Sequence, residues 1–133
     1  QIKRLGEFGR FAGIAFQVID DILALTSDEN VLKKPVGNDI REGKRTLMVV
    51  YALKKANKIQ RQQILETLGN QKASAEQIKE TIAMIDSLGA ISYAKKMADK
   101  YITKSKKALA KFADGSDKKD LLSLADLIFD RQN

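Results

Sequence analysis

Apolar residues recur at steps of three and four along residues 11–25, and two aspartates interrupt them. The apolar positions are Phe11, Ile14, Val18, Ile22 and Leu25. This spacing predicts a helix with one face turned toward a core. Asp20 and Asp21 stand in the middle of it, although ionised aspartates are costly to bury and are poor helix formers. The pair therefore needs a counter-charge or a solvated cleft.

The composition excludes several kinds of chemistry. The 133 residues include no cysteine and no histidine, which rules out disulfides, thiolate sites, imidazole catalysis and the usual zinc sites. Any bound metal must therefore be hard and oxygen-ligated. One proline, eight glycines and no tryptophan favour an all-α fold. Since the sequence shows neither an export signal nor a long uncharged apolar run, we expect a cytoplasmic protein without stable membrane insertion.

The net charge of +7 points to an anionic partner. Nucleic acid, an acidic membrane surface and diphosphate substrates all qualify. Much of the excess is lysine spread along the later part of the chain, as in "KKMADKYITKSKKALAKFADGSDKKD", and this spacing is typical of a solvated helix face. Few aromatic residues lie among these lysines and no known nucleic-acid motif is present, so we expect no nucleic-acid binding.

The order of elements predicts a single helical segment over residues 1–133. Residues 26–45 break the helical period and hold the only proline, so we expect a functional loop there. Further helices are expected to begin near Thr46, to run from 57 to 68, to end before Gly89, to run from Ala90 to about Phe112, and to follow Gly115. Ser74 with Gln77 forms a predicted capping box, and Ser116 a predicted N-cap.

Polar residues gather on one side of the first helix and in the loop that follows. Gln17, Asp20, Asp21 and Ala24 lie at i, i+3, i+4 and i+7, and so share a face opposite much of the apolar stripe. Phe16 lies one turn from Asp20 on that side. The loop then supplies more charged residues: Lys34, Asp39, Glu42, Lys44 and Arg45.

Two accounts of these charges stay open from the residues alone. The first is a set of ordinary salt bridges. The second is a magnesium ion, which takes carboxylate oxygens and water and fills its other positions from a phosphate-bearing substrate. Lys34 and Lys44 would then balance the phosphate charge, and Gly37 and Gly43 would let the backbone approach the bound group.

Two consecutive motifs resemble a known enzyme family. "GIAFQVIDDILAL" followed by "KPVGNDIREGKRTL" is similar to the second aspartate-rich region of the trans-prenyl diphosphate synthases, which include the farnesyl and geranylgeranyl diphosphate synthases. The matching positions are Gly13, Phe16, Gln17, Asp20, Asp21, Lys34, Gly37, Asp39, Gly43, Lys44 and Thr46. The later "GAISYAKKMADKYITKSKKAL" resembles the family's C-terminal helices. The resemblance covers essentially the whole chain and implies an isoprenoid-synthase-type helical bundle.

The resemblance also implies a reaction. These enzymes ionise an allylic diphosphate, join the allylic cation to isopentenyl diphosphate and release a proton, with Mg²⁺ holding the leaving diphosphate. Asp20 is then expected to ligate magnesium directly, and Asp21 and Asp39 to act through metal-bound water. Lys34 and Lys44 are expected to contact the departing diphosphate. Gln17 is expected to line the substrate side, with Phe16 packed beside it.

This chain departs from the family pattern at a few positions. Ala24 replaces the last aspartate of the motif, Lys33 replaces a glycine, and Met48 stands where proline is frequent. No first aspartate-rich motif is present. We therefore expect residues 1–133 to be the C-terminal portion of a synthase and to have no synthase activity alone. Apolar faces left without partners are expected to drive formation of a homodimer or larger homo-oligomer.

Other functions remain possible at this point. A non-catalytic helical subunit that partners a catalytic synthase is one alternative, favoured by Ala24 and the short length. A basic module that binds nucleic acid or an anionic membrane is another. A terpene cyclase or head-to-head synthase is the third, although the loop "KPVGNDIREGKRT" favours chain elongation.

Overall fold

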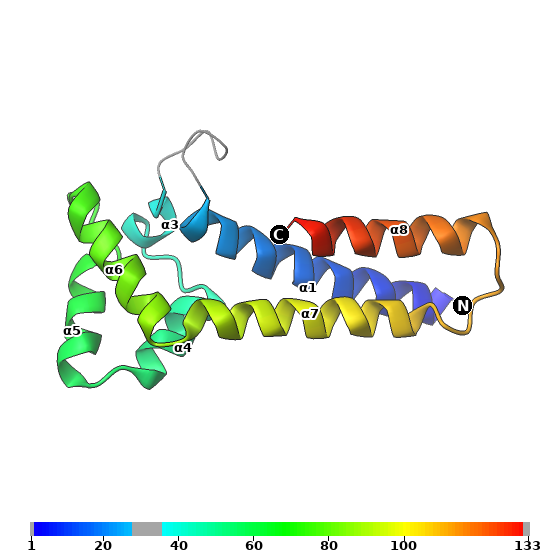
Figure 1. Cartoon of the computed structure of the whole chain (residues 1–133), viewed down its shortest axis with the longest axis horizontal. Coiled ribbons are helices and arrows are strands. Elements are labelled where there is room, and N and C mark those ends of the chain that lie inside the picture. The colour runs from blue at the N-terminus through cyan, green and yellow to red at the C-terminus, as the bar shows by residue number, and fades with distance from the viewer. Residues whose placement is uncertain (1, 28–35, 132–133) are drawn as a thin grey trace. The chain divides into compact units, whose positions relative to one another are not determined.

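The computed structural model describes residues 2–27 and 36–131. Within these ranges every regular element is a helix (Figure 1), so the prediction of an all-α fold is confirmed there. The elements are α1 (Ile2–Thr26), α3 (Asn38–Arg41), α4 (Leu47–Lys55), α5 (Lys58–Thr67), α6 (Ala75–Ser87), α7 (Ala90–Ala108) and α8 (Ser116–Asp130).

The chain divides into two compact units. One unit consists of residues 1–20 and 95–133, and the other of residues 21–94. Because the boundaries fall inside α1 and α7, each of these helices contributes to both units.

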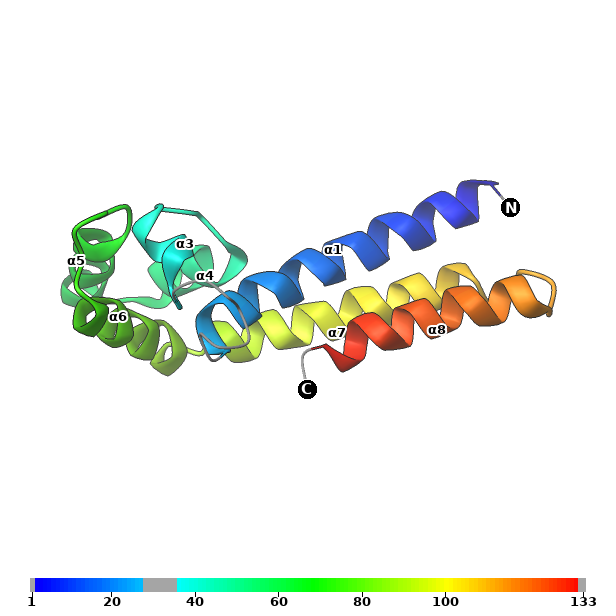
Figure 2. The same cartoon turned by 90° about the horizontal axis from the view of Figure 1, so that it is seen from above.

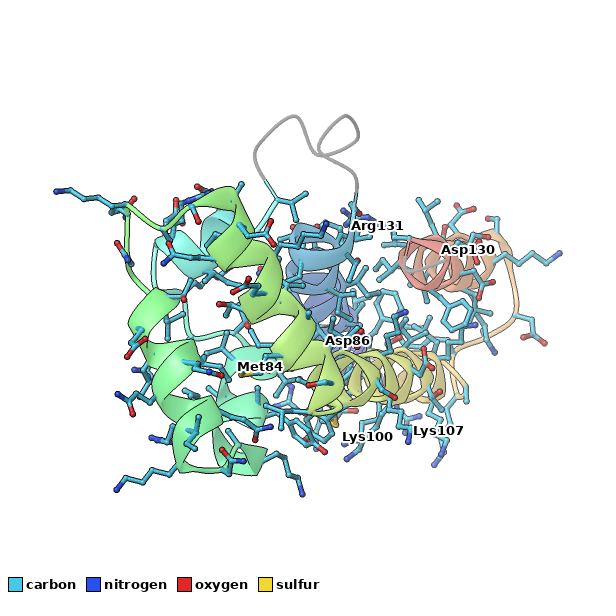
Figure 3. The ribbon with its side chains drawn as sticks, turned by 60° about the vertical axis from the view of Figure 1, so that its left-hand side comes forward. Met84, Asp86, Lys100, Lys107, Asp130 and Arg131 are labelled. Atoms are coloured by element: carbon cyan, nitrogen blue, oxygen red, sulfur yellow. The ribbon has the colours of Figure 1, made fainter. Side chains whose placement is uncertain are left out.

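In the first unit, α8 turns back after the end of α7 and runs beside it in the opposite direction (Figures 1 and 2). The ring of Phe11 in α1 packs against Tyr101 in α7, with ring centroids 6.1 Å apart. An ion pair between Lys106 and Asp126 joins α7 to α8. Figure 3 shows Lys100 and Lys107 projecting from α7 away from α8, as expected for a solvated lysine face.

In the second unit, α6 packs against α5 and α4. Ile64 and Ile85 are fully buried there, as is Met48 of α4. The rings of Tyr51 and Tyr93 stack with centroids 4.3 Å apart. These apolar contacts form the core of the unit, and Met48 belongs to it. An apolar side chain at position 48 therefore has a packing role in this chain.

The buried face of α1 differs from the predicted one. Its buried apolar members within α1 are Phe8, Ala12, Ala15, Ile19, Ile22, Ala24 and Leu25. Ile14 is 37% exposed, and the prediction that it faces the core is wrong. Alanines let a neighbouring helix approach closely, so they mark the contact face although they contribute little to an apolar pattern.

Most helix ends agree with the sequence. The capping box of α6 is confirmed: Gln77 N–H donates to Ser74 Oγ at 3.1 Å, and Ser74 N–H donates to Gln77 Oε1 at 2.8 Å. Thr46 caps α4 through Val49 N–H. Gly89, at φ 84°, follows α6 in the left-handed conformation that glycine adopts without steric cost.

Three boundaries were predicted incorrectly. The helix expected to reach Phe112 ends at Ala108. Ser116 is the first residue of α8 and not its N-cap, which is Gly115. The segment 26–45 is not all loop: Thr26 still belongs to α1 and residues 38–41 form α3. A short helix is possible there because Gly37 adopts a left-handed conformation at its start.

Several large apolar side chains of the first unit are exposed. They are Ile2, Leu5, Ile14 and Phe16 in α1 and Leu124, Leu127 and Phe129 in α8. Among the helices described, none is both long and apolar enough to cross a lipid bilayer.

Candidate functional site: the acidic pair of α1 and its cations

The two aspartates lie side by side in sequence near the end of α1, yet their environments differ. The Asp20 side chain is 46% exposed, and that of Asp21 only 12%. Consecutive residues of a helix point about 100° apart, so one of them turns outward and the other sits at the edge of the buried face. Gln17 and Asp20 are exposed, whereas Asp21 and Ala24, which were predicted to share their face opposite the apolar stripe, are buried.

Asp21 is paired with Lys44. The Lys44 ammonium lies 3.0 Å from Asp21 Oδ1, across 23 positions of sequence. The backbone on both sides of Lys44 fixes its position: the Lys44 N–H donates to the carbonyl of Asp39 at 2.9 Å, and Thr46, two residues later, is the N-cap of α4. The structure thus brings two of the predicted site residues into direct contact.

Gly37 and Gly43 shape the segment that carries Lys44. Gly37 donates its N–H to the carbonyl of Ala24 at 3.2 Å, which attaches the start of α3 to the end of α1. A Cβ on Gly37 would come within 2.3 Å of Ile78, and one on Gly43 within 3.1 Å of Gly69. In this structure the two glycines therefore allow close packing within the protein, where the sequence had suggested close approach to a ligand.

Asp39 is also buried, in the first turn of α3. Its carboxylate makes no hydrogen bond or ion pair within the described ranges. A buried carboxylate without a partner is costly unless a cation or donor reaches it, so Asp39 is a candidate for contact with a bound cation. Lys34, the remaining predicted residue, lies outside the residues that the structure describes.

Asp20 pairs with a different basic side chain, which the sequence did not reveal. Arg131, just after α8, donates from Nη2 to Asp20 Oδ1 at 2.7 Å. Its guanidinium carbon lies 4.3 Å from the centroid of the Phe16 ring. Figure 3 labels Arg131 at the end of α8. No motif pointed to Arg131, because 111 positions separate it from Asp20 and only folding brings the two together.

The donor set suits magnesium better than a closed metal cage. Among the described residues, no three histidine, cysteine or acidic side chains converge to hold a metal ion. Mg²⁺ does not require such a cluster, because it commonly takes one or two carboxylates, keeps several waters and completes its shell with substrate phosphate. Asp20 and Asp21, together with Asp39 from the segment that follows α1, supply carboxylates of the kind that bind Mg²⁺ in this way.

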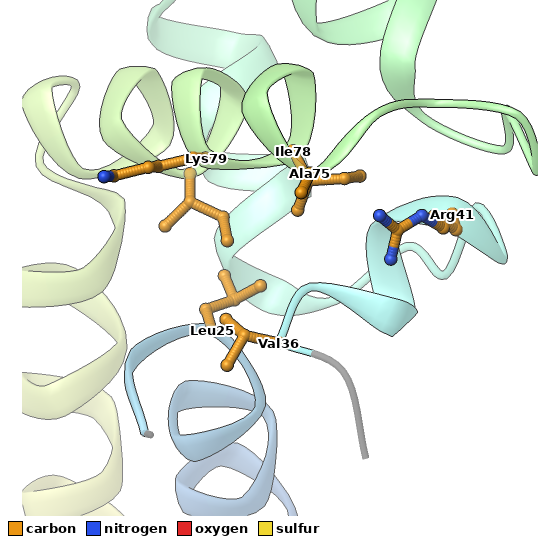
Figure 4. A pocket seen from close by; sticks show the side chains of 7 residues that line it. Leu25, Val36, Arg41, Ala75, Ile78 and Lys79 are labelled. Atoms are coloured by element: carbon orange, nitrogen blue, oxygen red, sulfur yellow. The ribbon is translucent and has the colours of Figure 1, made fainter. Parts of the chain in front are cut away.

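A separate pocket lies in the second unit. Its volume is about 400 Å³, and its walls are Leu25, Val36, Arg41, Ala75, Ile78, Lys79 and Ile82. Figure 4 shows Ile78 and Ala75 of α6 on one side and Leu25 and Val36 on the other. Of the predicted site residues that lie within 2–27 and 36–131, none lines this pocket. The acidic pair is therefore not part of it.

The contact between Asp21 and Lys44 leads to a stability prediction. Lys44→Gln is expected to lower the free energy of unfolding by about 1 to 3 kcal/mol, because the largely buried carboxylate loses the ammonium that faces it. Urea unfolding followed by circular dichroism measures the change. In an Asp21→Asn background the same substitution is expected to cost much less. An equal cost in both backgrounds would contradict the pairing.

Comparisons with known proteins agree with the residue pattern. Residues 1–85 match the family model described as "Polyprenyl synthetase". A geranylfarnesyl diphosphate synthase of Aeropyrum pernix is 42% identical over 92% of this chain and 37% of its own length. A short chain isoprenyl diphosphate synthase of Methanothermobacter thermautotrophicus is 36% identical over the whole of this chain and 40% of its own.

Solved structures give the same result. The geranylgeranyl pyrophosphate synthetase of Pyrococcus horikoshii superposes with a TM-score of 0.89 and 38% identity, over 96% of this chain and 38% of that one. The chain thus spans well under half the length of these relatives. The family model matches more than half of the residues of this chain, and the superposition with the Pyrococcus horikoshii structure covers nearly all of them. This chain belongs to the polyprenyl synthetase family.

Proposed function

We propose that this chain is the diphosphate-binding part of a trans-prenyl diphosphate synthase, which lengthens an allylic diphosphate with isopentenyl diphosphate. One observation carries the proposal. Lys44, which follows α1 in the chain, donates from its ammonium group to Oδ1 of Asp21 in the acidic pair of α1, at 3.0 Å. Related proteins with these functions in their names support it. So does the magnesium and isoprenyl diphosphate complex of a geranylgeranyl pyrophosphate synthase from Corynebacterium glutamicum, at a TM-score of 0.90 and 29% identity.

In this proposal, Asp20, Asp21 and Asp39 would hold Mg²⁺, Asp20 by direct contact and the other two through water. Bound magnesium supplies positive charge that stabilises the leaving diphosphate. Lys44 and Lys34 donate to the diphosphate oxygens. Lys44 already lies 3.0 Å from Asp21, so this lysine and one of the proposed metal-holding carboxylates are close together before a substrate binds.

The reaction itself proceeds in three stages. The bond between the allylic carbon and the diphosphate oxygen breaks, and its electron pair leaves with the diphosphate. The double bond of isopentenyl diphosphate supplies the electrons of the new carbon–carbon bond. A proton then departs, and a new double bond forms. Gln17 and Phe16 line the substrate side, where an exposed aromatic ring is suited to contact with an apolar prenyl chain.

Residues 1–133 are, in this proposal, the C-terminal portion of the synthase. The chain spans between 35% and 40% of the length of three related synthases. The other helices of the complete protein would supply the first aspartate-rich motif and the isopentenyl diphosphate site. The apolar side chains exposed on α1 and α8 favour association with further polypeptide, and the homodimer stays a prediction.

A product assay tests this function. The complete protein is incubated with isopentenyl diphosphate and a set of allylic diphosphates of increasing length, with and without Mg²⁺. We expect prenyl diphosphates longer by whole isoprene units, formed only with Mg²⁺, when products are identified by mass spectrometry. Hydrolysis or cyclisation of the allylic substrate without chain growth would contradict the proposal and favour a cyclase-type enzyme.

A further inference from the structure

The contact between Arg131 and Asp20 joins the end of the last helix to the aspartate-rich motif of α1. Within the first unit, the Arg131 guanidinium donates to Asp20 Oδ1 at 2.7 Å and lies 4.3 Å from the centre of the Phe16 ring. A residue just after the last helix therefore contacts two residues that the motif assigns to the site. α8 also has contacts away from Arg131, because Ala125 and Ile128 are buried and Lys106 pairs with Asp126.

A guanidinium and a divalent cation both bind the lone pairs of a carboxylate. Arg131 occupies Oδ1 of Asp20, the side chain proposed to ligate magnesium directly. Both partners are partly exposed, with 35% of the Arg131 side chain and 46% of the Asp20 side chain open to solvent. Such an ion pair contributes little net free energy, so a metal ion can displace the guanidinium.

Phe16 provides a place for the displaced guanidinium. Cations are attracted to the face of an aromatic ring, and the interaction does not involve Asp20. If the carboxylate turned to a metal ion, this second contact would still be available to Arg131.

We propose that Arg131 is a positioning residue that holds the Asp20 carboxylate in the metal-free protein and competes with the metal ion for it. The proposal rests on the proposed function, because it requires Asp20 to be a metal ligand. In this proposal the guanidinium and the metal ion compete for the same carboxylate. Removal of the guanidinium must therefore strengthen the binding of a divalent ion, whereas loss of a structural contact would weaken it or leave it unchanged.

A titration with Mn²⁺ tests the competition, since Mn²⁺ takes the same oxygen ligands as Mg²⁺ and its free concentration is measured by electron paramagnetic resonance. The complete protein is titrated without diphosphate as wild type, Arg131→Gln, Arg131→Lys and Asp20→Asn. Lys106→Gln is the matched control, because it removes an ion pair between α7 and α8 without touching the acidic pair. Thermal unfolding of each variant confirms that it is folded.

We expect Arg131→Gln to lower the dissociation constant for Mn²⁺ about two- to fivefold, as the free energy of an exposed ion pair allows. Arg131→Lys is expected to restore most of the wild-type value, and Lys106→Gln to have no effect. Equal or weaker Mn²⁺ binding by Arg131→Gln would overturn the inference and leave the proposed function intact. If Asp20→Asn does not weaken Mn²⁺ binding, Asp20 is not a ligand, and both are overturned.

Discussion

Replacement of Asp20 by alanine in the complete protein is expected to lower kcat for chain elongation by at least about 100-fold. The carboxylate is proposed to hold the ion that stabilises the departing diphosphate, so its removal acts on the transition state more than on substrate binding. Steady-state assays at saturating Mg²⁺ and substrates measure the change.

Protein stability separates this effect from misfolding. Among the residues that the structure describes, Arg131 is the side chain that pairs with Asp20, in a partly exposed ion pair, and such pairs contribute between about 0 and 1 kcal/mol. The melting temperature of Asp20→Ala is therefore expected to stay near that of the wild type. Asp86→Ala, which removes an exposed carboxylate of α6, is the control and should keep full activity. An Asp20→Ala enzyme with more than a tenth of wild-type kcat would argue against direct metal ligation.

Gly37→Ala is expected to lower the free energy of unfolding by about 2 to 5 kcal/mol. Two costs add. The residue has φ 78°, a left-handed conformation that strains any residue with a Cβ, and the new methyl group would lie 2.3 Å from Cγ2 of Ile78. Ile78 is 3% exposed and lies in α6, where a β-branched side chain strongly prefers one χ1 rotamer, so moving Cγ2 aside is costly. Urea unfolding with a fluorescence or circular dichroism readout gives the value.

A double-mutant cycle distinguishes the two costs. In an Ile78→Ala background the clash disappears, and Gly37→Ala is expected to cost only the backbone strain of about 1 to 2 kcal/mol. Gly115→Ala is the control, because Gly115 has an extended backbone and open space around it. A Gly37→Ala protein as stable as the wild type would show that the segment from α1 to α3 can rearrange.

The local features of the helices were readable from sequence, because their causes are local. The capping box of Ser74 and Gln77 requires only residues three apart, and Gly89 ends α6 through its own backbone conformation. Boundaries without such a signal were placed less well. The end of α7 at Ala108 has no glycine or proline to mark it in sequence.

The rotation of α1 shows where pattern reasoning failed. An apolar stripe counted from large residues put Ile14 toward the core, but the contact face runs through Ala12 and Ala15. Which side of a helix is buried depends on the shape of the surface packed against it. Small residues such as alanine contribute little to an apolar pattern, so a pattern of large apolar residues does not reveal a contact face made of them.

By itself, the sequence determined the family, and it supplied the residues of the candidate site: two carboxylates and a lysine-bearing loop, without histidine or cysteine. Only the tertiary structure decided which cation meets which carboxylate. Lys44 reaches Asp21 because the segment around Gly37 packs closely against the end of α1, and Arg131 reaches Asp20 across 111 positions. The reason is physical: contacts between residues distant in sequence arise from packing, and neither spacing nor residue type encodes them.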